Sequence, residues 1–80
     1  MSIFYFDFRD DEELVIDEEG VELRDLFAVQ NEAARALAGL AWDEMRVERS
    51  AGKRIAIEVR DEHGPVMNVK FCFEIEKKHL

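Results

Sequence analysis

Two clusters of acidic side chains are the residues of this chain with the most evident capacity for chemistry, since carboxylates bind divalent cations. The clusters occupy residues 10–13 and 17–19, and Gly20 follows the second. A calcium loop needs several oxygens converging at about 2.3–2.6 Å from alternating residues around a central glycine. Here the acids are consecutive, so neighbouring side chains diverge. The spacing therefore favours two solvated turns and predicts no metal site.

The other reactive side chains have no evident partners. Catalysis needs a nucleophile, a base and an orienting group that converge. His63 lies in a predicted turn, and His79 lies near the end of the sequence. Cys72 falls on the outer face of a predicted strand, where a weakly polar filler is commoner than a thiolate, although an exposed thiol beside Lys70 would be reactive. Phosphate-loop and nucleophile-elbow motifs are absent. We expect a protein that is not an enzyme, without catalytic residues, metal or cofactor.

The composition predicts one small acidic domain that spans residues 1–80. Hydrophobic residues make up 48% of the chain, enough for folding, and the formal net charge is −8. This charge repels phosphate backbones and anionic membranes. A single cysteine excludes an internal disulfide and fits a reducing, cytoplasmic location. Neither a signal peptide nor a run of about 20 apolar residues is visible, so we expect no membrane and no nucleic-acid partner.

Residues 25–46 form the segment long enough for an amphipathic helix, with Asp25 as its N-cap. Their apolar side chains at helical spacing predict a stripe that faces the core, namely Leu26, Val29, Ala33, Ala36, Leu37, Leu40 and Ala41.

A second apolar set is rotated by about 80–160° around the same helix. Its members are Phe27, Ala34, Ala38, Trp42 and Met45, which we call the helix flank. In one interpretation Phe27 and Met45 belong to the core margin and Trp42 packs against the loop at 47–53. In the other, the helix flank is a self-association surface, because exposed apolar patches with aromatic residues often mark interfaces.

Strand-like runs lie on both sides of the helix. Residues 3–8 alternate so that Phe4, Phe6 and Phe8 share one face, which we expect to face the core. Residues 14–16 predict a short second strand that forms a hairpin with the first.

Residues 55–60 and 67–76 predict a second hairpin around the turn at 61–64. A three-residue loop with Gly64 in the left-handed conformation places Asp61 opposite Pro65. The same register brings the apolar sets together, pairing Val59 with Met67, Ile57 with Val69, and Ile55 with Phe71.

These elements predict an α+β fold of order ββαββ, a four-stranded, mainly antiparallel sheet with one long helix packed on one face. We favour the strand order 2-1-3-4 over 2-1-4-3, because antiparallel pairs are commoner. The second sheet face then carries a mixture of charged side chains together with Ile3, Tyr5, Ala56 and Cys72.

The chain also resembles a family of small uncharacterised domains found mainly in alphaproteobacteria. The resemblance lies in Phe4-Tyr5-Phe6-Asp7, in residues 17–23, in the alanine-rich helix and in residues 57–66. It covers nearly the whole chain. It implies one compact bacterial domain and supplies no functional residues.

Three functions follow as hypotheses. The leading one is a non-enzymatic, cytoplasmic protein-interaction domain, with a homodimer as one form. The alternative is a small antitoxin-like module linked to nucleic-acid regulation. Only four basic residues approach a patch for it, namely Arg46, Arg49, Lys53 and Arg54. The third is small-ligand binding on the open sheet face, which predicts a pocket near Tyr5 and Cys72; Tyr5 and Asp7 are its polar candidates.

Overall fold

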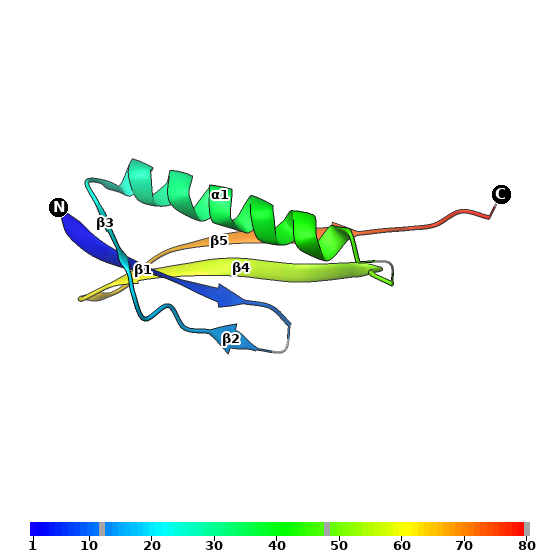
Figure 1. Cartoon of the computed structure of the whole chain (residues 1–80), viewed down its shortest axis with the longest axis horizontal. Coiled ribbons are helices and arrows are strands. Elements are labelled where there is room, and N and C mark those ends of the chain that lie inside the picture. Colours follow the sequence, from blue (N-terminus) through cyan, green and yellow to red (C-terminus); the bar gives the residue numbers. More distant parts are fainter. Residues whose placement is uncertain (12, 48, 80) are drawn as a thin grey trace.

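The fold consists of one helix packed against an antiparallel sheet, and this confirms the predicted α+β class (Figure 1). The computed structural model describes residues 1–11, 13–47 and 49–79. Its elements are β1 (Ser2–Arg9), β2 (Leu14–Val15), β3 (Val21–Leu23), α1 (Leu26–Met45), β4 (Gly52–Asp61) and β5 (Gly64–Glu74).

The strand order β2-β1-β4-β5 is the predicted one, and every pairing is antiparallel. The predicted count of four strands was one too low, because the short strand β3 also pairs with β1. β2 lies against Phe8 and Arg9, whereas β3 lies against the other end of β1, at Ser2 to Phe4. On this edge of β1, neither of the two short strands pairs with its middle residues, whereas the other edge pairs with β4.

The hairpin of β4 and β5 has the predicted apolar pairs. Val59 lies opposite Met67, and the pairing continues unbroken to Gly52. The predicted pair of Asp61 with Pro65 was wrong, because Asp61 pairs with Gly64. The loop is thus one residue shorter than expected, and an irregularity between Val59 and Arg60 restores the register. Gly64 has the expected positive φ, at 122°.

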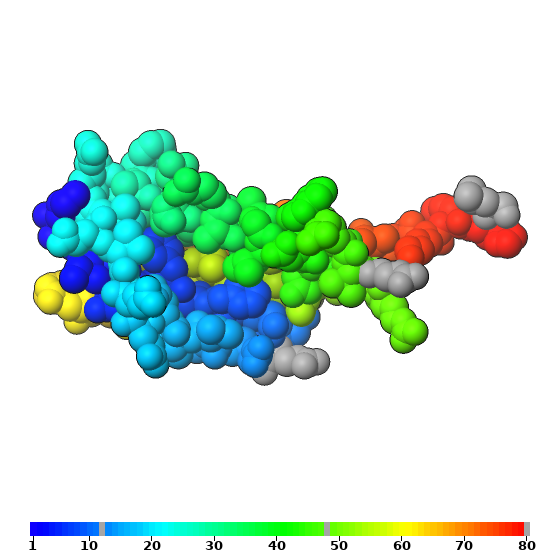
Figure 2. All heavy atoms as spheres, viewed as in Figure 1, coloured from blue at the N-terminus to red at the C-terminus, as the bar shows by residue number. Residues whose placement is uncertain are grey.

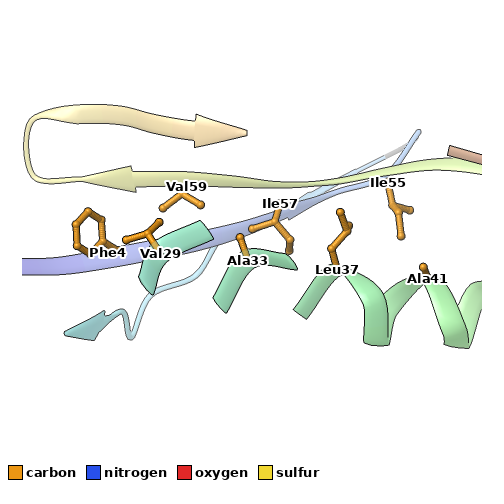
Figure 3. Packing of buried hydrophobic residues seen from close by; sticks show 8 residues of the cluster. All are labelled: Phe4, Val29, Ala33, Leu37, Ala41, Ile55, Ile57 and Val59. Carbon is orange, nitrogen blue, oxygen red and sulfur yellow. The ribbon is translucent and has the colours of Figure 1, made fainter. Parts of the chain in front are cut away.

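The core lies between α1 and the central strands (Figure 3). On α1 the buried residues recur every four positions, at 29, 33, 37 and 41, so one side chain per turn lies against the sheet. Two of these four helix residues are alanines, Ala33 and Ala41, and their small side chains let the helix approach the sheet closely. The buried side chains are Phe4, Val29, Ala33, Leu37, Ala41, Ile55, Ile57 and Val59.

Part of the predicted helix stripe lies outside this core. Leu26 is 57% exposed and Ala36 is exposed, whereas Leu40 is half-buried and packs against the core as predicted. Near the start of the helix Leu23 of β3 packs against the core, whereas Leu26, the first residue of α1, is largely exposed.

The phenylalanines of β1 differ in their burial for a related reason. Phe4 is buried, whereas Phe6 and Phe8 are half-buried. The helix packs mainly on β4 and β5, so it does not fully cover the β1 side of the face. The protein is elongated, with extents of 54 × 23 × 16 Å, and the C-terminal residues, red in Figure 2, extend beyond the body.

Two leucines of the same helix test this arrangement. We expect Leu37→Ala to lower the free energy of unfolding by about 3 kcal/mol, because it opens a cavity in the core. Leu26→Ala removes the same atoms from a largely exposed side chain, so we expect a change within about 0.5 kcal/mol. Chemical denaturation of both variants measures the difference. Equal losses for the two variants would contradict this orientation of the helix.

Candidate functional site

The helix flank is exposed along the length of α1. Phe27 is 75% exposed, Trp42 62% and Met45 37%, and Ala34 and Ala38 are exposed between them. The interpretation of Phe27 as core margin was therefore wrong. Among the described residues, the aromatic contact on this surface is a local one, in which the Arg46 guanidinium lies 5.8 Å from the Trp42 ring centroid.

The helix that presents this flank is capped at its start. Asp25 is the N-cap as predicted, because its Oδ1 accepts the Ala28 N–H at 2.8 Å. Ion pairs of i, i+3 spacing join Glu32 to Arg35 and Asp43 to Arg46. These charged side chains are thus paired with one another, and of these four the Arg46 guanidinium lies over the Trp42 ring of the flank.

The opposite face of the sheet carries a buried carboxylate that sequence analysis did not predict. Asp7 is only 5% exposed. Its Oδ2 accepts a hydrogen bond from Nε of Arg60 at 2.9 Å, and its Oδ1 accepts one from the backbone N–H of Asp17, also at 2.9 Å. Nη2 of Arg60 donates to the Asp17 carbonyl oxygen at 2.9 Å. The guanidinium therefore joins β1, β4 and the chain between β2 and β3.

Asp17 takes the place of a strand partner for the middle of β1. Its Oδ2 accepts the Phe6 N–H at 3.0 Å, and its Oδ1 accepts the N–H groups of Glu19 and Gly20 at 3.0 and 3.3 Å. Burial raises the pKa of this carboxyl, but the three N–H donors and the nearby guanidinium outweigh it. The pKa of Asp17 therefore lies below its ordinary value of 3.8.

Gly20 and Tyr5 complete this network. Gly20 has φ +77°, and a Cβ there would lie 2.7 Å from Ile3 Cγ2 and 2.9 Å from Tyr5 Cε1. Arg60 stacks over the Tyr5 ring at 4.5 Å. The candidate polar ligands Tyr5 and Asp7 are thus engaged by the protein itself. Within the described ranges, every buried side-chain nitrogen or oxygen has a hydrogen-bond partner.

The first acidic cluster is also tied into the fold. Lys53 lies 3.3 Å from Glu44 of α1 and 3.6 Å from Asp10. The hydrogen bond to Glu44 is the main cause that raises the pKa of Lys53. Asp10 Oδ1 in turn accepts the Glu13 N–H at 2.9 Å. Among residues 1–11, 13–47 and 49–79, no group of three His, Cys, Asp or Glu side chains is arranged to hold a metal ion.

The remaining reactive side chains do not converge. His63 is exposed in the hairpin loop, 3.4 Å from Glu62, and His79 is exposed near the C-terminus. Cys72 is exposed on β5, opposite Arg54 of β4. The described residues thus offer no nucleophile with an adjacent base.

Two hollows lie near the residues that the third hypothesis named. The first measures about 360 Å³, and its lining combines three cations and two aspartates with less polar residues, namely Arg9, Asp10, Asp11, Arg54, Ile55, Ala56, Lys70, Phe71 and Cys72. The second measures about 340 Å³ and includes Tyr5, with acidic neighbours Glu22, Asp61 and Glu62. The open sheet face is therefore not flat, and these two hollows differ in their charged lining.

Fold and surfaces together define a small α+β domain with an exposed apolar helix flank. The chain belongs to the family described as domain of unknown function DUF6894, whose model matches residues 3–72. This confirms the resemblance to a family of uncharacterised domains, while the alphaproteobacterial origin stays a prediction. No curated protein and no solved structure gives a significant match.

The one helix in the described part of the chain does not combine the length and the apolar character that crossing a membrane requires.

Asp17→Asn tests the role of the second acidic cluster. We expect a loss of roughly 2 kcal/mol in the free energy of unfolding at neutral pH, because an amide group replaces one acceptor oxygen among N–H donors. The folded pKa of Asp17 is lowered, so its charge stabilises the fold above the unfolded value near 3.8. That contribution disappears as the pH falls through the folded pKa.

Denaturation of both proteins between neutral and strongly acidic pH measures this effect, and the difference between them should shrink below about pH 4. Asp43→Asn, an exposed carboxylate of α1, serves as the control and should change stability by under about 1 kcal/mol. A pH-independent difference between wild type and Asp17→Asn would contradict the assignment.

Proposed function

We propose that this chain is a non-enzymatic, cytoplasmic protein-interaction domain and that its helix flank binds a second copy of the same chain. The observation that carries the proposal is the exposure of Phe27 and Trp42, at 75% and 62%. Aromatic side chains are enriched at protein–protein interfaces relative to the rest of the surface. The flank also runs the length of a 20-residue helix, which offers a continuous surface.

The order of side-chain sizes along the flank suits a second copy in an antiparallel orientation. A two-fold axis midway between Ala34 and Ala38 places each of these alanines opposite the other in the partner helix. The same axis places Phe27 opposite Met45. Small residues at the centre permit close approach of the helices, and large residues fill the ends. Antiparallel helices also oppose their dipoles favourably.

Nucleic-acid regulation has weaker support as an alternative. Of the four basic residues near one another in sequence, Arg46 is paired with Asp43, and Lys53 is paired with Glu44 and Asp10. The net charge of −8 opposes contact with a phosphate backbone. A protein partner is therefore the better proposal.

The oligomeric state tests the self-association. We expect sedimentation velocity to show a dimer whose population grows with protein concentration. Ala38→Glu puts two like charges near the two-fold axis, so it should raise the dimer Kd by at least about tenfold, equivalent to about 1.4 kcal/mol.

Ala36→Glu is the matched control, since Ala36 is an exposed alanine of the same helix outside the flank, and it should leave the Kd unchanged. A wild-type protein that stays monomeric at high concentration, or equal effects of the two glutamates, would contradict the proposal.

Cross-linking tests the predicted orientation. In a Cys72→Ser background, a mixture of the Ala34→Cys and Ala38→Cys chains should form mainly mixed disulfides, because the antiparallel dimer brings these two positions together. Each variant alone should oxidise slowly. Preferential disulfides between identical chains would show a different arrangement.

A further inference from the structure

The hollow on the outer sheet face is built by one row of side chains across three strands. Arg9 of β1 lies opposite Ala56 of β4, and Ala56 lies opposite Lys70 of β5. Since adjacent strands are about 4.8 Å apart, this row spans roughly 10 Å. The short alanine forms a floor between two long side chains. Arg54 and Cys72 form the neighbouring cross-strand pair and extend the hollow.

The charges around this hollow are only partly neutralised. Arg9 forms an ion pair with Glu58 at 2.5 Å, whereas Arg54 and Lys70 have no acidic partner among the residues that the structure describes. Two cations without an acidic partner in the described part of the chain thus line one hollow, on a protein whose net charge is −8. Such a local positive site attracts an anion.

The rest of the lining restricts which anion fits. Asp10 and Asp11 also line the hollow, so a highly charged phosphate ligand meets repulsion there. The stems of Arg9 and Lys70, with Ala56 and Cys72, offer apolar surface. The volume of about 360 Å³ lies at the lower end of the range for small-molecule sites.

We propose that this hollow binds a small organic monocarboxylate with a flat apolar body, its carboxylate held by Arg54 and Lys70. The apolar part of the ligand lies over Ala56 and against Cys72. The site lies on the sheet face opposite α1, so it is independent of the helix flank and of the proposed self-association.

Cys72 supplies a local readout, because it is the only thiol of the chain. The probe is naphthoate, an aromatic monocarboxylate, and the measurement is the rate at which Cys72 reacts with the neutral reagent dithiodipyridine. We expect naphthoate to slow the reaction with a saturable concentration dependence. Naphthamide, which has the same shape without the charge, should need at least about tenfold higher concentration, a difference of about 1.4 kcal/mol.

Two double variants with the same change in net charge separate a local site from general electrostatics. Arg54→Gln with Lys70→Gln should weaken protection by naphthoate at least about tenfold. Arg24→Gln with Arg35→Gln alters exposed residues outside the hollow and should leave protection unchanged. Ala38→Glu should also retain it, whether or not the chain dimerises. Unsaturable protection, equal protection by the amide, or equal behaviour of the two double variants would overturn the proposal.

Discussion

The ion pair between Asp7 and Arg60 is the interaction on which the N-terminal half of the fold depends. Asp7 is nearly inaccessible to water, and an unpaired carboxylate in such a place is costly. Arg60 neutralises it, and the same guanidinium binds the carbonyl oxygen of Asp17. The segment between β2 and β3 is therefore fixed to the sheet by charge and hydrogen bonds on the face that no helix covers.

The helix face is governed by a different constraint, which is that one helix cannot cover the whole sheet. α1 packs mainly on β4 and β5, and its core contacts come from one side chain per turn. Leu40 is half-buried against the core, but most helix residues outside that row are exposed to solvent, including the large Phe27 and Trp42. A chain of this size has little apolar surface to spare, so leaving two aromatics uncovered favours a second surface that buries them.

Sequence patterns predicted the elements better than their environments. Alternation and turn chemistry located the β4 and β5 hairpin. The loop is one residue shorter than predicted, and the irregularity between Val59 and Arg60 keeps Ile57 opposite Val69, so that the apolar sets still share one face. Helical spacing located the flank but placed Leu26 in the core, because the pattern does not contain the position of Leu23. The role of Asp17 depends on contacts with residues more than ten and forty positions away, which no local pattern contains.

The distribution of charge separates the two proposed surfaces. On α1 the acids and bases neutralise one another at i, i+3 spacing, so the helix flank presents apolar atoms to a partner with little net field. On the outer sheet face Arg9 is paired with Glu58, whereas Arg54 and Lys70 have no ion-pair partner within residues 1–11, 13–47 and 49–79. An apolar surface suits a protein of identical charge, whereas a local positive hollow suits a small anion. Because the sheet lies between them, occupancy of one surface leaves the other accessible.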